Sequence, residues 1–244
     1  MYPVIFRIGS FEVMSFGLLV AVGALVGVWL FGRELRSSRL PADAVNGAII
    51  GLLAGLAGAK LLYVAEHLGE DRFFSLLLSR GGLSWFGGLF AGICAALAYF
   101  RWRRWPILSI ISAATPALAV GHALGRVGCF LVGDDYGRPT SLPWGIAFPQ
   151  GSPPTDVPVH PAQLYEAALL GILAWLLIRW RRGGAADRVV VARYLLLTGI
   201  IRFIIEFVRV NVRVAFGMSV AQFGALLLIA AGLVLLRRPP VKPA

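Results

Sequence analysis

The strongest constraint on this chain is a series of apolar segments that are each long enough to cross a lipid bilayer. Roughly 17–25 helical residues cross about 30 Å of hydrocarbon. Only 14% of the residues are charged and 58% are hydrophobic, which leaves too few charges for a water-facing surface. The sequence predicts an all-α integral membrane protein, built as a single polytopic domain over residues 1–244. We place its seven transmembrane helices at residues 12–32, 44–65, 83–100, 105–125, 161–178, 190–209 and 214–236.

Basic residues lie between the predicted spans. A net charge of +11 would also fit a nucleic-acid-binding protein, but the basic residues gather at alternate junctions. Cytoplasmic loops of membrane proteins carry an excess of Lys and Arg. We therefore expect the amino terminus outside, the carboxyl terminus inside and no nucleic-acid partner. The four groups are Arg33, Arg36 and Arg39; Arg101, Arg103 and Arg104; Arg179, Arg181, Arg182, Arg188 and Arg193; and Arg237, Arg238 and Lys242.

Small residues recur at helical spacing in the second and third predicted spans. Gly47, Gly51 and Gly55 are four residues apart, and Gly88 and Gly92 repeat that spacing. Small residues at this interval let two membrane helices approach closely. The pattern predicts helix packing at these positions.

One long extracytoplasmic loop, from about residue 125 to residue 160, joins the fourth and fifth predicted spans. Its glycines and prolines favour turns. A solvated surface loop explains its charges without a function, and a site at the membrane surface is the alternative. The charged or titratable residues are Arg126, Asp134, Asp135, Arg138, Asp156 and His160.

The sixth predicted span contains charges at membrane depth. In RFIIEFVR, Arg202 and Glu206 are one turn apart, and Arg209 follows a further turn along. Such a charge costs at least about 2.5–3.5 kcal/mol, so it normally faces the bundle interior and has a partner. A structural ion pair is one interpretation, and a functional site is the other. Glu166, one turn after Gln163, is a weaker example of the same kind.

Arginines at the outer leaflet suit a phosphate-bearing ligand, because guanidinium groups offer two-point hydrogen bonding and stay charged. A phospholipid head group is the nearest candidate. No metal site is predicted, because His67, His122 and His160 are far apart and the sequence has no HExxH or paired-cysteine pattern. It has no GxSxG elbow or Walker-type loop either.

Several motifs together resemble the prolipoprotein diacylglyceryl transferase family, bacterial enzymes that begin lipoprotein maturation. They are GLLVAVG, GGLSWFGGLFAG, GRVGCF followed by GDDYGR, HPAQLYE and RFIIEFVR, and the resemblance covers nearly the whole chain. It implies transfer of the diacylglyceryl group from phosphatidylglycerol to the thiol of a lipobox cysteine in a secreted prolipoprotein. Glycerol 1-phosphate is released, and no cofactor is required. The implied place is the outer leaflet of the bacterial plasma (inner) membrane, among membrane lipids.

The resemblance also implies roles for individual residues. Arg126 and Arg202 match family arginines, and we expect both to bind the phosphate. Gly137 and Glu206 match signature residues, and Asp134 falls where the family has a glutamate. We expect these three residues to orient the arginines or to accept hydrogen bonds from the glycerol head group. We further expect substrate contacts at Arg138, His160 and Gln163.

The chain departs from the family pattern at four positions. Phe16 and Thr198 replace tyrosines, Phe86 replaces a histidine, and Cys129 replaces an asparagine. We expect Phe16, Phe86 and Cys129 to border the substrate. His122 either supplies the missing imidazole as a catalytic group or is simply hydrogen-bonded near a helix end. Cys129 is either a nucleophile that forms a covalent lipid intermediate or a small buried apolar group.

Two other functions stay open. A paralogue would transfer a phosphatidylglycerol-derived group to a different acceptor, and a phospholipid-binding or anion-conducting protein would perform no chemistry. Asp134 beside Arg126 discriminates between them, because binding needs only the cations whereas turnover needs the acid.

Overall fold

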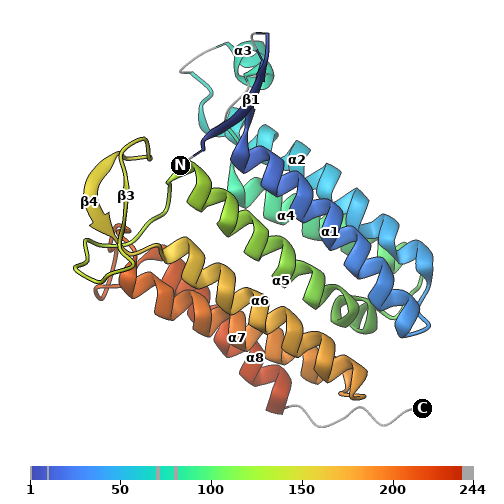
Figure 1. Cartoon of the computed structure of the whole chain (residues 1–244). Coiled ribbons are helices and arrows are strands. Elements are labelled where there is room, and N and C mark those ends of the chain that lie inside the picture. The colour runs from blue at the N-terminus through green and yellow to red at the C-terminus, as the bar shows by residue number, and fades with distance from the viewer. Residues whose placement is uncertain (1, 10, 70–71, 80–81, 238–244) are drawn as a thin grey trace. The chain divides into compact units, whose positions relative to one another are not determined.

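Figure 1 shows a computed structural model of the chain, which describes residues 2–9, 11–69, 72–79 and 82–237. The chain divides into two compact units. One unit comprises Met1–Leu30 and Ile111–Ala244, and the other comprises Phe31–Ile110. The expectation of a single polytopic domain stays a prediction. Arg238 and Lys242 of the last basic group lie outside the described residues.

Long helices occupy all the predicted spans. By length and apolar composition, five segments qualify as membrane-spanning: Ser15–Ser37, Ala42–Glu66, Ile107–Val132, Ala162–Arg182 and Val220–Arg237. The chain is therefore a multi-pass membrane protein, and the number of seven spans stays a prediction. The long helices are α1 (Ser15–Ser37), α2 (Val45–Glu66), α4 (Trp85–Trp102), α5 (Ile107–Val132), α6 (Ala162–Arg182), α7 (Asp187–Val208) and α8 (Val220–Arg237); η1 (Ala42–Ala44) and α3 (Phe73–Leu78) are short.

The long elements are all helices, as predicted, and two short antiparallel hairpins accompany them. Strand β1 (Val4–Ile8) pairs with β2 (Phe11–Met14), and β3 (Ile146–Phe148) pairs with β4 (Thr155–Val159). The strands are only three to five residues long, so they lack a periodic pattern strong enough to be read from the sequence. The β3–β4 hairpin extends beyond the amino end of α6 (Figure 1).

Helix α5 is longer than expected at its carboxyl end. The predicted fourth span ends at residue 125, but the helix continues to Val132, so GRVGCFLV is helical. The loop that follows begins at Gly133, which has a left-handed φ of +74°. This extra helical stretch carries Arg126 and Cys129 on a rigid element.

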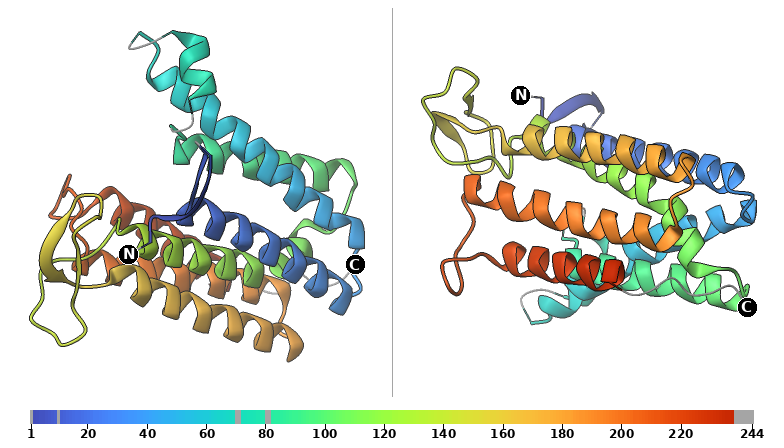
Figure 2. Two further views of the ribbon diagram at one scale, coloured as in Figure 1. Left: turned by 45° about the horizontal axis from the view of Figure 1, so that its top comes forward. Right: turned by 90° about the horizontal axis from the view of Figure 1, so that it is seen from below.

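The core of the first unit lies between α5, α6 and α7. Helix α6 contributes a stripe of four residues at the 3.6-residue period, which packs against one small residue of α5 and one of α7. Helices α6, α7 and α8 run side by side (Figure 2). The buried core residues are Leu170, Leu173, Ala174 and Leu177 of α6, Ala119 of α5 and Val190 of α7.

Glycines set the closest helix contacts in each unit. In the second unit, Gly51 faces Gly92 and Gly55 faces Gly88, which confirms the predicted packing of α2 on α4. In the first unit, α7 meets α8 at Gly199, where an added Cβ would lie 2.8 Å from the backbone oxygen of Ala225. The backbone nitrogen of Ile229 would lie 3.1 Å away as well, so α8 leaves no room for a side chain there.

We expect Gly199→Ala to lower the apparent melting temperature of the detergent-solubilised protein. The new methyl group meets α8, and overpacking of this kind costs about 1–3 kcal/mol. Gly171→Ala in α6 is the matched control, because an added Cβ there meets nothing within 4 Å. Alanine otherwise favours a helix over glycine by about 1 kcal/mol. Equal melting temperatures for the two variants would contradict the close contact.

Candidate functional site

The buried carboxylate of Glu166 in α6 is surrounded by cationic and imidazole groups. Its side chain is 1% exposed. Its oxygens lie 3.0 Å from Nε of Arg126, 3.3 Å from Nη1 of Arg202 and 3.8 Å from Nη1 of Arg209. Nε2 of His122 lies 3.6 Å away. Charges predicted separately in three parts of the sequence therefore converge on one acid.

Three helix ends bring these groups together. His122 and Arg126 are one turn apart near the carboxyl end of α5, and Arg202 and Glu206 are one turn apart near that of α7. Glu166 lies in the second turn of α6. Nη2 of Arg202 is 3.1 Å from Oε2 of Glu206, so the predicted pair within α7 forms.

The segment after α7 folds back over Glu206. This carboxylate is fully buried, and it accepts hydrogen bonds from Oγ of Ser219 at 2.7 Å and from the Asn211 amide. Nη2 of Arg213 donates to the backbone oxygen of Glu206 at 3.1 Å. Arg202 thus pairs with an acid that is itself fixed by neutral donors.

Asp135 bridges two of the arginines. Its Oδ2 lies 2.8 Å from Nη1 of Arg126, and its Oδ1 forms an ion pair with Nη2 of Arg209. The residue adopts a left-handed φ of +59°, and its side chain is 41% exposed. Burial would raise the pKa of Asp135, but the hydrogen bond and charge of Arg209, together with Arg126, outweigh it and lower the pKa.

Asp134 has a different environment from the one expected. The described ion pairs of Arg126 are with Asp135 and Glu166, not with Asp134. The backbone oxygen of Asp134 accepts a hydrogen bond from Gln163, and one carboxylate oxygen is buried without a partner among the described residues. Burial raises the pKa of Asp134. The left-handed backbone of Asp135 explains why Asp135, and not Asp134, pairs with the arginines, because it turns the Asp135 carboxylate toward them.

Ligand atoms of Cys129, Asp134 and Asp135 lie within 4.8 Å of one another, a grouping that metal ions also use. Here, however, Asp135 already pairs with two guanidinium groups, and Nη1 of Arg126 is 4.0 Å from Sγ of Cys129. Positive charge this close disfavours a divalent cation. The expectation that the site holds no metal stays a prediction.

Gly137 lies against the end of α7 and against the segment just before α6. Its N–H donates to the backbone oxygen of His160 at 2.8 Å, and an added Cβ would lie 3.0 Å from the backbone oxygen of Val208. The N–H of Arg138 donates to Val208, and that of His160 to Arg138. These backbone contacts hold the loop beside the arginine cluster. Substrate contacts of Gly137, exposed Arg138 and His160 stay predictions.

The other expected residues are spread over both units. Cys129 is 8% exposed, and Thr198 has a buried Oγ1 without a hydrogen-bond partner among the described residues. Phe16 of α1 packs near Gly128 of α5. Phe86 belongs to the second unit, in α4, where it is exposed. The substrate contacts of Phe16, Phe86 and Cys129 stay predictions.

The sequence analysis noted Glu166, Asp135 and Arg209 as charged residues but did not assign them to the site. The signal for Glu166 is its place in HPAQLYE, one turn inside a helix that begins at Ala162. Arg209 has a spacing signal, since it lies three residues after Glu206. Asp135 has no sequence signal, because its role depends on the backbone conformation of the loop.

These features define a class: a multi-pass membrane protein with a buried arginine–carboxylate cluster where three helices meet. A family model for prolipoprotein diacylglyceryl transferase matches residues 3–238. The chain belongs to the prolipoprotein diacylglyceryl transferase family.

Relatives support this membership along the whole chain. The phosphatidylglycerol–prolipoprotein diacylglyceryl transferase of Clostridium tetani (strain Massachusetts / E88) is 30% identical over 239 residues, which is 96% of each chain. That of Shewanella sp. (strain ANA-3) is 30% identical over 266 residues, covering 98% of this chain and 96% of the relative. That of Vibrio vulnificus (strain YJ016) is 32% identical over 219 residues, covering 85% and 78%.

We expect Glu166→Gln to destabilise the protein strongly. The amide leaves the buried guanidinium groups without their shared counter-charge, and breaking a buried pair from one side costs about 3–5 kcal/mol. The measurement is the apparent melting temperature in detergent. Glu12→Gln is the control, because the Arg7–Glu12 pair is exposed and such pairs contribute about 0–1 kcal/mol. A similar small effect for both variants would show that Glu166 is not the centre of the cluster.

Asp134→Asn should raise the melting temperature in a pH-dependent way. The raised pKa of Asp134 means that its contribution to stability is complete below the ordinary value of about 3.9 and is lost as the pH rises through the folded-state pKa. Asparagine does not ionise, so the difference between variant and wild type should grow from acid to neutral pH. A difference that is constant with pH would contradict the burial of the Asp134 carboxylate.

Proposed function

We propose that this protein transfers the diacylglyceryl group of phosphatidylglycerol to the lipobox cysteine of a prolipoprotein. The names of its relatives support these substrates. The structural observation that carries the proposal is the convergence of Arg126, Arg202 and Arg209 on Glu166. A set of fixed guanidinium groups suits a lipid phosphate.

The reaction needs stabilisation of a leaving phosphate. The cysteine sulfur attacks the glyceryl carbon that bears the phosphate, the carbon–oxygen bond breaks, and glycerol 1-phosphate leaves. The thiol proton goes to a base. Preorganised cations lower the barrier by taking up the charge that develops on the leaving oxygen. No cofactor takes part in this scheme.

We assign the phosphate contacts to Arg126 and Arg202. Their side chains are 16% and 18% exposed. Arg209, whose side chain is 4% exposed, shares Asp135 with Arg126 and so adds a further guanidinium group at the Arg126 position. Glu166 and Glu206 orient them. His122, with its side chain 38% exposed and its Nε2 3.6 Å from Glu166, is our candidate for the proton acceptor. A thiol with an ordinary pKa of about 8.5 needs only modest help.

We further propose that all seven long helices span the bacterial plasma membrane as one domain, with the amino terminus and the active site on the extracytoplasmic side. Two features within the first unit support this arrangement. Arg179, Arg181 and Arg182 lie at the carboxyl end of α6, whereas Glu166 lies near its amino end. Arg193 stacks on Trp180 at 4.6 Å, which keeps the basic residues of α6 and α7 together. The positive-inside tendency then makes the arginine-rich junction cytoplasmic.

A second candidate is a paralogue with a different acceptor. The observation in its favour is Cys129, which stands where the resemblance places an asparagine and lies 4.0 Å from Nη1 of Arg126. A change of polarity beside the phosphate arginines alters what else binds there, without removing the cations.

We expect the purified protein to add one diacylglyceryl group to a lipobox peptide and to release glycerol 1-phosphate when supplied with phosphatidylglycerol. Mass spectrometry measures both products. Arg126→Ala and Arg202→Ala should each reduce the rate by about 100-fold or more, as loss of a charge-stabilising donor does. Arg7→Ala is the control, because that side chain is 69% exposed and pairs only with Glu12 among the described ion pairs.

Two results would redirect the proposal. An unmodified peptide with arginine-dependent binding of phosphatidylglycerol would favour another acceptor or a lipid-binding role. Equal activity of wild type and both arginine variants would remove the arginines from the mechanism.

A further inference from the structure

The carboxylate of Asp135 lies between two guanidinium groups, with one oxygen on each. Its Oδ2 is 2.8 Å from Nη1 of Arg126, and its Oδ1 pairs with Nη2 of Arg209. A phosphodiester also presents two free oxygens on one centre, and guanidinium groups bind both kinds of anion. The pair of arginines therefore offers one binding position that suits a carboxylate or a lipid phosphate.

We propose that Asp135 occupies the phosphate position between Arg126 and Arg209 when no lipid is bound, and that phosphatidylglycerol must displace it. The inference rests on the proposed function, because that function brings the lipid phosphate to Arg126. It makes Asp135 a residue that sets the affinity for the lipid.

Charge balance requires an acid to leave when the phosphate enters. The three arginines face three ion-paired carboxylates, those of Asp135, Glu166 and Glu206. A phosphodiester brings a fourth negative charge into the cluster. The phosphodiester and the carboxylates would repel one another strongly in a partly buried site. One carboxylate therefore has to move away or the lipid binds weakly.

Of the three ion-paired carboxylates, Asp135 is the one placed to move. The side chains of Glu166 and Glu206 are 1% and 0% exposed and lie within helices, so rearranging either would leave uncompensated buried charge. Asp135 lies in the loop after α5 with its side chain 41% exposed. A rotation about its side-chain bonds carries the carboxylate into water, where its charge is solvated.

Competition between Asp135 and the lipid phosphate should change the apparent dissociation constant for the lipid by a measurable factor. When the binding-competent state is only a fraction of the population, the apparent dissociation constant rises by the inverse of that fraction. If the paired state of Asp135 dominates by up to an order of magnitude, its removal strengthens apparent lipid binding by about threefold to tenfold. The turnover number at saturating lipid should change less than the half-saturating lipid concentration.

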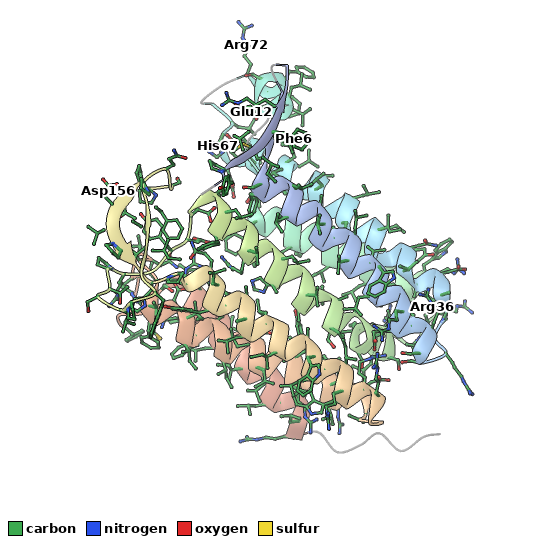
Figure 3. The ribbon with its side chains drawn as sticks, in the orientation of Figure 1. Phe6, Glu12, Arg36, His67, Arg72 and Asp156 are labelled. Atoms are coloured by element: carbon green, nitrogen blue, oxygen red, sulfur yellow. The ribbon has the colours of Figure 1, made fainter. Side chains whose placement is uncertain are left out.

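Two substitutions test Asp135 without straining the backbone. Both Asp135→Asn and Asp135→Gly tolerate the left-handed φ of +59°. The matched control is Asp156→Asn, which removes a negative charge from the exposed strand β4 in the same loop region (Figure 3). Asp156 has no described ion pair with the arginines, so it reports the general effect of the lost charge.

The experiment uses the full-length protein in dodecyl maltoside micelles with increasing mole fractions of phosphatidylglycerol. Native mass spectrometry measures lipid binding without peptide, and glycerol 1-phosphate release measures turnover with a lipobox peptide. We expect the half-saturating mole fraction to fall about threefold to tenfold for both Asp135 variants relative to wild type and to Asp156→Asn.

Weaker lipid binding in both Asp135 variants would overturn the proposal, because it would mean that Asp135 holds the arginines ready for the lipid. Values equal to those of Asp156→Asn would also overturn it, because Asp135 would then not compete. If wild type releases no glycerol 1-phosphate, the proposed reaction fails, and the binding comparison still decides the role of Asp135.

Discussion

The placement of charge in an apolar helix bundle depends on the Glu166 carboxylate. A carboxylate that is 1% exposed is tolerated only when opposite charges surround it. Arg126 comes from α5, and Arg202 and Arg209 come from α7. A slide of one turn between these helices would separate Glu166 from its three arginines and leave a buried carboxylate without opposite charge. The ion cluster therefore fixes the register of the three helices in the first unit.

The position of the loop after α5 follows from the same need to pair every buried charge with an opposite one. Arg126 and Arg209 have positive charge beyond what Glu166 alone balances, and Asp135 provides the remainder from outside the helices. Gly137 lets the chain pass close to His160 and Val208, which holds the loop at the helix ends. The loop thus contributes to the ion cluster through the contacts of Asp135 with Arg126 and Arg209, and its role as a functional site stays a prediction.

The sequence predicted the individual helices and helix contacts better than the way in which three helices assemble the ion cluster. Length and apolar composition located every long helix, and the glycine spacing located the contact of α2 with α4. The pair of Arg202 and Glu206 was visible from helical spacing alone. The central role of Glu166 was not, because it depends on α5 continuing to Val132 and on three helices meeting at one end. Asp135, and not the expected Asp134, pairs with the arginines because of its left-handed backbone, which no local sequence pattern indicates.

The departures from the family pattern have a consistent physical meaning. By the resemblance, they replace a phenol, an imidazole and an amide at Phe16, Phe86 and Cys129 and exchange a phenol for a smaller hydroxyl at Thr198, whereas the arginines and carboxylates of the cluster all form ion pairs. Electrostatic stabilisation is usually the largest contribution to catalysis of this kind. Neutral polar groups mainly select and orient what lies beside the reacting atoms. We therefore expect a chain with this ion cluster and changed neutral surroundings to retain the charge that expels a phosphate and to contact head group and acceptor in its own way.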